Sequence, residues 1–474
     1  MTVDPYNPGP AVPQRFLGLS FEAAALPRIA QYAHRGNLVR MLRSLVPGVL
    51  RFGGITADED VAWTDAATPK PAWASSTIDD ADMQALGVLA RRSDWKVLLT
   101  VGLAHDEPVA AAREVAAAHA ALGPYLYAVE IGNEPDAYGN HGFRALPWIA
   151  QGYEEEVSEY RKAIARLTPD VPIAGPDVSG SGVFGEWGEE EALSQRPVLL
   201  TGHHYPLGCA QTPPPSIESL LSPAIRGKEA QSLETYMKVA GAYRIPVRID
   251  EAGSVSCGGV PGISDTFAST LWATAYITQT MDAGAAGINL QGNPTNCAGY
   301  TPLCAPDQTA VATGALRAQP EWYALLLTHA LVGSRLLAAT ISTAGGLPAP
   351  NLVASAFAGP AGSEQVVLVD DEPPSAAPLT LTLATGLGSG AGKTARAIRL
   401  TAPAQNASAG VLLADRAVAA NGSWRAPEHT ETIPAIAANL TMTLAPSSAT
   451  LLTLGPDHPL GAPGRHRSAG AGRR

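Results

Sequence analysis

Two acidic residues stand where apolar runs of the chain end, and their types suggest paired carboxylate chemistry. Glu134 follows the run at 125–133 and precedes Pro135, and Glu251 follows the short apolar run at 246–249. Cleavage of a glycosidic bond needs one carboxylic acid that protonates the departing oxygen and one carboxylate that faces the anomeric carbon. Glu134 and Glu251 therefore predict a glycosidase centre, with Glu134 as acid/base and Glu251 as nucleophile.

The choice of Glu251 over its neighbour Asp250 rests on strand geometry. Successive side chains of a strand point to opposite faces, so we expect only one of the two acids to face the site. Glu251 lies nearer the end of the run and is followed by Ala-Gly-Ser. A solvated charge is the ordinary interpretation of any single Glu, but two acids that both end apolar runs favour catalysis.

The elements that must position these acids follow a βα pattern between residues 16 and 333, where β-rich runs alternate with Ala-rich helical stretches. Several runs are rich in Val, Ile and Leu, as strands buried on both faces should be. Eight such units predict a (β/α)8 TIM barrel, whose catalytic side chains lie at the carboxyl ends of the strands. The runs are 16–22, 49–54, 96–103, 125–134, 172–179, 198–205, 246–253 and 285–292.

The pattern changes after about residue 335. Short Thr-, Val- and Leu-rich runs separated by Gly, Pro, Asn and Ser predict a C-terminal antiparallel β-sandwich domain. We therefore divide the chain into a catalytic barrel at 14–335, a β-sandwich at 336–456 and a disordered tail at 457–474. Because no linker separates the two domains, we expect the sandwich to pack on the barrel and stabilise it.

Composition excludes several classes of partner. With 46% hydrophobic and 16% charged residues the chain should be globular, and its net charge of −11 disfavours nucleic acid, anionic membranes and long polyanions. No run of about eighteen apolar residues and no export signal is recognisable, so we expect a soluble protein whose localisation stays open. Four cysteines without metal-ligand spacing predict neither a metal nor a cofactor, and they allow three disulfide pairings.

Five segments in order resemble glycoside hydrolase family 79 of clan A, a family of β-glucuronidases and heparanases. The likeness covers about residues 16–455 and implies the same catalytic pair, Glu134 and Glu251. It also implies an export signal and a β-strand before residue 16, neither of which the sequence displays. The segments are LGLSFE at 17–22, LRFGGITAD at 50–58, VEIGNEPD at 129–136, GHHYP at 202–206 and GISDTFAS at 262–269.

The resemblance also assigns substrate-binding roles. It implies that Asn133 binds the sugar 2-OH, that Tyr205 lies beside the nucleophile, and that Tyr300 binds the 6-carboxylate of a uronic acid. Asp58 and, by its similar position, Glu22 would contact sugar hydroxyls. Each has an ordinary alternative: a turn-forming Asn133, a packing role for Tyr205, and a loop cap or salt bridge for the two acids.

Three further residues are predicted from their positions. Arg51, at the end of the second run, could orient the nucleophile and keep it ionised; the alternative is an ordinary salt bridge within the barrel. His203 and His204 are adjacent on a strand, so one should line the site and the two cannot bind one metal ion. The backbone N–H groups around Gly258 could bind a carboxylate.

Together these residues predict a retaining exo-glycosidase that removes terminal β-D-glucuronic acid, or a modified uronic acid, from a carbohydrate substrate by double displacement. Retention requires the two carboxyl groups to lie ~5 to 5.5 Å apart. Exo action is favoured because no Lys and Arg clusters suited to a polyanion occur in the β/α loops. The alternatives are a clan relative acting on a neutral sugar, a heparanase-like endo-β-glucuronidase and a catalytically silent carbohydrate-binding protein.

Overall fold

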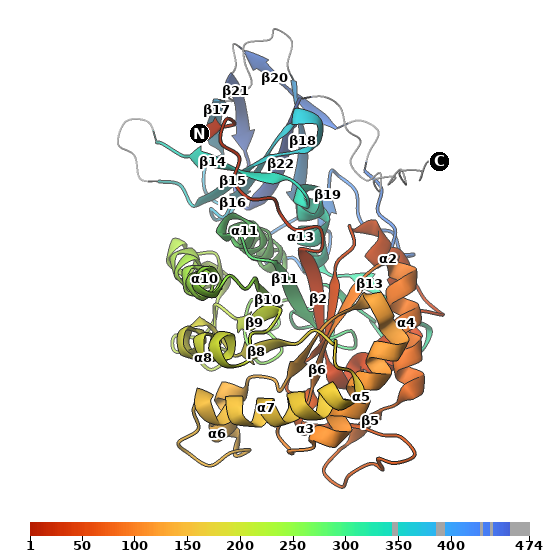
Figure 1. The fold of residues 1–474 in the computed structure, drawn as a ribbon. Helices are drawn as coiled ribbons and strands as arrows, with labels where there is room; N and C mark the ends of the chain where they lie inside the picture. The colour runs from red at the N-terminus through yellow and green to blue at the C-terminus, as the bar shows by residue number, and fades with distance from the viewer. Residues whose placement is uncertain (344–348, 385–393, 427–429, 437–438, 456–474) are drawn as a thin grey trace, which may run out of the picture.

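A computed structural model describes residues 1–343, 349–384, 394–426, 430–436 and 439–455. Its first domain is a barrel of eight parallel strands, which confirms the predicted (β/α)8 fold (Figure 1). All eight predicted runs contain a strand of this barrel. The strands are β2 (Leu17–Glu22), β3 (Val49–Gly53), β6 (Lys96–Val101), β7 (Leu126–Ile131), β8 (Ala174–Val178), β9 (Leu199–His204), β10 (Val247–Ala252) and β11 (Gly287–Gly292).

The barrel closes between its fourth and fifth strands. The strand order β7-β6-β3-β2-β11-β10-β9-β8 leaves β7 and β8 at the two ends, and a parallel bridge joins Val129 to Ile173 across the gap. The Val129 N–H donates to the Pro172 carbonyl at 2.9 Å. A closed sheet brings the carboxyl ends of all eight strands to one rim, where the predicted catalytic acids stand.

Helices surround the barrel, and their ends follow familiar signals. Asp79 caps α4 by accepting from the Ala81 and Asp82 N–H groups, and Pro108 begins α5. Among the described residues no helix has both the length and the apolar character to cross a membrane. The main helices are α1 (Leu26–Gln31), α2 (Leu38–Ser44), α4 (Asp80–Ser93), α5 (Pro108–Leu122), α7 (Ala150–Leu167), α8 (Ser181–Ser194), α10 (Pro223–Tyr243), α11 (Phe267–Ala283) and α13 (Pro320–Thr328).

Short elements lie in the loops at the carboxyl ends of the strands and between the helices. They shape the surroundings of the barrel rim without adding to the barrel sheet. They are α3 (Thr56–Glu59), α6 (Tyr138–His141), α9 (Ile217–Leu220), α12 (Gln308–Thr313) and the strand pairs β4 (Val61–Trp63) with β5 (Ser76–Ile78) and β12 (Leu303–Cys304) with β13 (Arg317–Ala318).

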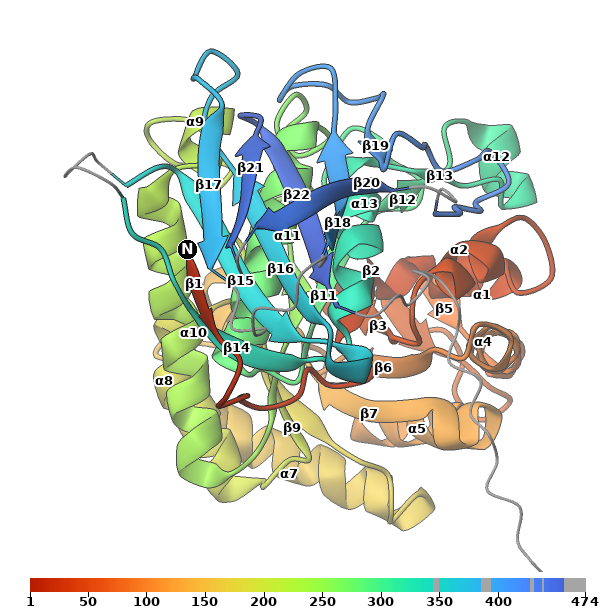
Figure 2. The same ribbon diagram turned by 90° about the horizontal axis from the view of Figure 1, so that it is seen from above.

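The second domain is a two-layered β-structure, which confirms the predicted sandwich (Figure 2). Its strand order is β19-β18-β20-β21-β17-β1-β14-β15-β16-β22, and β22 also pairs with β18, so the layers are continuous at their edges. Its C-terminal strands are β14 (Arg335–Thr340), β15 (Leu352–Ala358), β16 (Glu364–Asp370), β17 (Leu379–Ala384), β18 (Thr394–Thr401), β19 (Leu412–Leu413), β20 (Glu431–Ile436), β21 (Asn439–Leu444) and β22 (Ser448–Leu454). The predicted tail at 457–474 lies outside the described residues.

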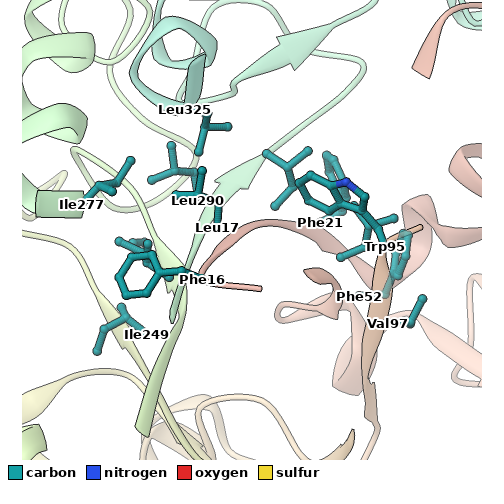
Figure 3. Packing of buried hydrophobic residues seen from close by; sticks show 14 of the residues in the cluster. Phe16, Leu17, Phe21, Phe52, Trp95, Val97, Ile249, Ile277, Leu290 and Leu325 are labelled. Carbon is teal, nitrogen blue, oxygen red and sulfur yellow. The ribbon is translucent and has the colours of Figure 1, made fainter. Parts of the chain in front are cut away.

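The two domains share a packed interface made by α11 and one layer of the sandwich. Along β16, Val366 and Leu368 face the interior of the sandwich, whereas Val367 and Val369 belong to the large barrel cluster. Helix α11 contacts β15, β16 and β22 on one side and the barrel on the other, so it is buried nearly all around. Figure 3 shows the apolar packing that continues from Ile277 of α11 to Leu290 of the barrel.

The first residues of the chain form a strand that the sequence did not reveal. Strand β1 (Thr2–Asp4) pairs antiparallel with β14, with Val3 opposite Ala339, and also bonds β17. The expectation that no strand precedes residue 16 was therefore wrong. A three-residue strand with one buried apolar side chain is too short to show the alternation by which strands are predicted.

Two buried carboxyls outside the barrel interior lead to a prediction about stability. Burial raises the pKa of Glu114 to about 8, and burial raises the pKa of Glu321 to about 8 although the Ser269 hydroxyl donates to it. Between the ordinary Glu value of 4.5 and about 8 the folded chain binds more protons than the unfolded chain. Stability therefore falls as pH rises through this window.

We expect the melting temperature to be higher at pH 5 than at pH 8, by about 3 °C or more. The measurement is thermal unfolding across this range in buffers of constant ionic strength. Glu321→Gln should flatten the dependence, whereas Glu155→Gln, at an exposed position of α7, should leave it unchanged. An equal slope in wild type and Glu321→Gln would contradict the assignment.

Candidate active site

The rim of the barrel is organised around the guanidinium of Arg51. Arg51 lies on β3 and is 0% exposed, so its charge is compensated by side chains rather than by water. Its partners come from strands and loops on both sides of the barrel. They are Glu251 Oε2 (2.6 Å), Asp177 Oδ2 (2.7 Å), Asn133 Oδ1 (2.8 Å), Asp250 Oδ2 (2.9 Å), Glu130 Oε2 (3.1 Å) and Ser20 Oγ (3.1 Å).

Glu251 is held by two donors at the end of β10. Arg51 donates to one carboxylate oxygen, and the Tyr205 hydroxyl donates to the other at 2.7 Å. Burial favours the neutral acid, but the charges of His203 and Arg51 together with these hydrogen bonds outweigh burial and lower the pKa of Glu251. An ionised carboxylate whose side chain is 9% exposed fits the requirement for a nucleophile.

Glu134 lies in the loop that follows β7, three residues after the last residue of that strand, Ile131. Its backbone is left-handed, with φ of 46°, and its N–H donates to the Asp177 carbonyl at 2.9 Å. The Glu134 side chain is 26% exposed, and its Oε1 lies 2.8 Å from His203 Nδ1. Glu134 is therefore both reachable from solvent and tied to the buried network.

His203 connects Glu134 to the buried network around Arg51. Its Nε2 lies 2.8 Å from Asp177 Oδ1, so both ring nitrogens have a carboxylate at hydrogen-bond distance. Burial alone would lower the pKa of His203, but the charges of Glu251 and Asp177 and the hydrogen bonds to Asp177 and Glu134 raise it well above its ordinary value. His204 points elsewhere, stacking on Tyr276 with ring centroids 4.3 Å apart.

The separation of the two predicted catalytic acids is short. One oxygen of Glu134, one oxygen of Glu251 and one nitrogen of His203 all lie within 4.8 Å of one another. The closest oxygens of Glu134 and Glu251 are therefore no more than 4.8 Å apart, below the ~6.5 Å at which the inverting range begins.

The assumption that Asp250 and Glu251 face opposite ways was wrong. The register of β10 against β9 shifts between Ile249 and Glu251, which marks a β-bulge. A bulge breaks the alternation of side chains, so both acids approach Arg51. Burial and the negative charge of Asp177 raise the pKa of Asp250 to about 7, with Arg51 and His203 opposing.

Asp58 does not have the surroundings expected of a sugar contact. It is 1% exposed, and its oxygens accept from the N–H groups of Leu103, Ala104 and Asn133 and from the Tyr138 hydroxyl. The structure therefore places Asp58 behind Asn133, where it holds the loop. This corresponds to the loop-cap alternative, and the interpretation of Asp58 as a direct contact is corrected accordingly.

The remaining predicted residues gather near Glu251. The Gly258 N–H donates to the Tyr300 hydroxyl at 3.0 Å, and the Tyr300 ring lies 5.6 Å from that of Tyr205. Glu22 accepts from the Thr56 N–H and hydroxyl. Burial and the nearby charge of Glu251 raise the pKa of Glu22 to about 7, against the Thr56 hydrogen bonds and the charge of Arg51.

Sequence reasoning missed three acids of the network. Asp177 lies next to the last residue of β8, Val178, and Glu134 lies shortly after β7, so the same signal of an acid near the end of an apolar run could have found Asp177. Glu130 lies within β7 and has the Thr100 hydroxyl as a second donor, a contact that no local pattern predicts. Asp250 was set aside because the bulge was not foreseen.

Within the part of the chain that the structure describes, two groups of three side chains have the spacing of metal ligands. They are Glu134 with His203 and Glu251, and Asp177 with His203 and Asp250. Both groups depend on His203, whose two nitrogens already have carboxylate partners. Arg51 binds Glu251, Asp177 and Asp250 directly, and a permanent cation at that position would repel a second one. The donor set thus fits a proton-bearing network better than a metal site.

The disulfide pairs, which the sequence left open, are Cys209 with Cys257 and Cys297 with Cys304, with Cα atoms 6.0 and 5.4 Å apart. Both pairs lie in loops at the carboxyl ends of barrel strands. Cys257 precedes Gly258 directly, and the Cys297–Cys304 loop contains Tyr300. The disulfides therefore flank residues that lie near Glu251.

Comparison with known proteins gives a fold but no sequence match. Neither the known protein-family profiles nor the curated proteins contain a match to this chain. Among solved structures, a 4-O-α-L-rhamnosyl-β-D-glucuronidase from Fusarium oxysporum 12S, crystallised as a Rha-GlcA complex, has a TM-score of 0.74 at 18% identity, covering 96% of this chain and 100% of that one.

Two further structures extend the comparison. The GH51 arabinofuranosidase from Xanthomonas axonopodis pv. citri has a TM-score of 0.65 at 14% identity, covering 96% of this chain and 99% of that one. The GH30 xylanase C catalytic domain from Talaromyces cellulolyticus has a TM-score of 0.57 at 12% identity, with the same coverage. The chain thus has the fold of these glycoside hydrolases over nearly its whole length, a (β/α)8 barrel joined to a C-terminal β-sandwich.

Proposed function

We propose that this protein is a retaining exo-glycoside hydrolase that removes terminal β-D-glucuronic acid, or a modified uronic acid, from glycosides. The observation that carries the proposal is the distance between the two acids, with one oxygen of Glu134 and one of Glu251 within 4.8 Å. That spacing suits a covalent double displacement. The solved glycosidases of the same fold support the reaction class.

In the first step, a Glu251 oxygen attacks C1 of the sugar while the bond from C1 to the glycosidic oxygen breaks. The proton of Glu134 passes to the departing oxygen, so no free alkoxide forms. Arg51 and Tyr205 hold Glu251 ionised before attack and fix the direction of its carboxylate. Asn133, oriented by Arg51 and Asp58, lies beside Glu134 to bind the 2-OH.

In the second step, water gives a proton to Glu134 and attacks C1, and the ester bond to Glu251 breaks. Two displacements at C1 leave the configuration unchanged. His203 Nδ1 lies 2.8 Å from Glu134 Oε1, so one transferable proton is shared between these two atoms. When Glu251 becomes neutral in the ester, His203 loses one of the negative charges that raise its pKa.

The choice of a uronic acid rests on Tyr300 and Gly258. The Tyr300 hydroxyl accepts from the Gly258 N–H, which leaves its own O–H as a donor, and burial together with the charge of Glu251 raises the pKa of Tyr300 so that this proton is retained. A hydroxyl donor oriented in this way suits a carboxylate. The glucuronidase among the similar structures supports this choice, whereas the arabinofuranosidases favour a neutral sugar as the second candidate.

The test is hydrolysis of p-nitrophenyl β-D-glucuronide beside the matching glucoside, galactoside, xyloside and α-L-arabinofuranoside. We expect turnover of the glucuronide, with the β-anomer as the first product by NMR. Turnover of a neutral sugar alone would keep the mechanism and reject the uronic acid. Absence of turnover on all five with retained sugar binding would favour a catalytically silent carbohydrate-binding protein.

Removal of the Tyr300 hydroxyl should separate binding of the carboxylate from catalysis. We expect Tyr300→Phe to raise KM for the aryl glucuronide about tenfold, as loss of a hydrogen bond to a charged group costs about 1.5 kcal/mol or more, with kcat changed much less. Steady-state kinetics measures the split. Tyr276→Phe, at a buried tyrosine against His204 outside this group, is the control. An unchanged KM in Tyr300→Phe would remove Tyr300 from carboxylate binding.

A further inference from the structure

Three loops at the carboxyl ends of β9, β10 and β11 pack on one another beside Glu251. The first two are joined by a parallel bridge between Leu207 and Val255 and by the Ser256 N–H, which donates to the Leu207 carbonyl at 3.0 Å. The Cys209 N–H donates to Ser256 Oγ at 3.1 Å. The Cys209–Cys257 disulfide then cross-links these two loops covalently.

The second and third loops meet through glycines. A Cβ at Gly299 would overlap the Gly258 carbonyl, and a Cβ at Gly259 would lie 2.5 Å from the Tyr300 nitrogen, so the two backbones touch. Gly258 and Gly259 have φ of 86° and 85°, a left-handed conformation that favours glycine. The Gly258 N–H reaches the Tyr300 hydroxyl from this turn. A small displacement of the turn would therefore separate the two groups.

Cys257 itself is left-handed, with φ of 59°, directly before Gly258. A residue with a Cβ adopts this conformation only when its surroundings hold it. Here the cross-link to Cys209 anchors the turn from one side, and the close contact with Gly299 limits it from the other. The covalent bond is therefore one residue away from the N–H group that orients the Tyr300 hydroxyl.

We propose that the Cys209–Cys257 disulfide is a specificity-determining positioning element, which holds the Gly258 N–H against Tyr300 so that the Tyr300 O–H is oriented to bind the carboxylate of the sugar. This inference rests on the proposed function. The two catalytic acids have other supports, because Arg51 and Tyr205 hold Glu251 and His203 contacts Glu134. Loss of the disulfide should thus weaken carboxylate binding and leave the chemical step in place.

The test compares wild type with the Cys209→Ser/Cys257→Ser variant on p-nitrophenyl β-D-glucuronide. We expect KM to rise about tenfold, the affinity lost with one charge-assisted hydrogen bond, with kcat within about threefold of wild type. Inhibition by free D-glucuronate should weaken by the same factor, and inhibition by D-glucose should not change. Gln211→Ala is the control, because it removes a hydrogen bond to Gly208 in the same loop and keeps the cross-link.

Combination with Tyr300→Phe shows whether the effect passes through the carboxylate donors. We expect removal of the disulfide to change KM less than about twofold in the Tyr300→Phe background, since coupled residues are not additive. Fully additive effects, or equal losses in inhibition by glucuronate and glucose, would overturn the proposal. So would an unchanged KM in a variant that folds.

Should the double variant not fold, mild reduction of folded wild type provides the same comparison. Cys209 and Cys257 are exposed, whereas Cys304 is buried, so a phosphine should open the first pair selectively. In that reaction the phosphine and water supply the electrons and protons, giving two thiols and a phosphine oxide, and mass spectrometry after alkylation identifies the opened pair. A KM unchanged after opening would overturn the proposal; failure of wild type to hydrolyse any glucuronide would instead refute the proposed function.

Discussion

Replacing Glu251 by Gln is expected to lower kcat on the aryl glucuronide by a factor on the order of 10⁴ or more, as seen when a covalent nucleophile is removed. The amide cannot form the ester with C1, and it gives Arg51 and Tyr205 a neutral partner in place of an anion. Pre-steady-state and long-time hydrolysis assays measure the loss. Glu155→Gln, an exposed acid on α7, should keep wild-type rates.

Glu134→Ala should produce a different defect, which is a slow second step of the reaction. With a leaving group that needs no protonation, the first step survives and the glycosyl-enzyme accumulates, because no base activates water. Added azide should restore turnover and yield the β-glycosyl azide, since a small anion can enter beside C1 without a base. An α-glycosyl azide, or recovery with azide in Glu251→Ala but not in Glu134→Ala, would reverse the two assignments.

Replacing Arg51 by Met is expected to lower the free energy of unfolding by about 3–5 kcal/mol, because removal of one partner leaves buried charges without compensation. Four carboxylates, from Glu130, Asp177, Asp250 and Glu251, lie within 3.1 Å of this single guanidinium. Urea unfolding followed by tryptophan fluorescence measures the loss. The expected loss of stability is large because Arg51 forms ion pairs with acids on three other strands, β7, β8 and β10.

Two companion variants distinguish the charge from the shape of Arg51. Arg51→Lys keeps a cation but cannot make the same set of directed bonds, so it should recover part of the stability and little of the activity. Arg113→Met breaks the partly exposed pair with Asp65 and should destabilise the protein far less than Arg51→Met does. An Arg51→Met protein as stable as Arg113→Met would mean that the buried acids are largely neutral without Arg51.

The pattern of apolar runs determined the barrel. Each of the eight predicted runs contains a barrel strand, because a strand buried on both faces must be apolar along its whole length. The same reasoning placed Glu134 and Glu251 at strand ends, and closure of the sheet then brought strand ends that are far apart in the chain to one rim. Sequence alone was therefore sufficient for the fold class and the candidate acids.

The tertiary structure decided which groups meet. Asp250 reaches Arg51 because of a bulge in β10, Asp58 lies behind Asn133 because four protein donors surround it, and β1 joins the sandwich through only three residues. None of these leaves a local pattern, since each depends on partners distant in sequence. Hydrophobic periodicity reports which side of an element is buried, whereas the network of Arg51, His203 and Asp177 depends on distances between elements that only the packed barrel sets.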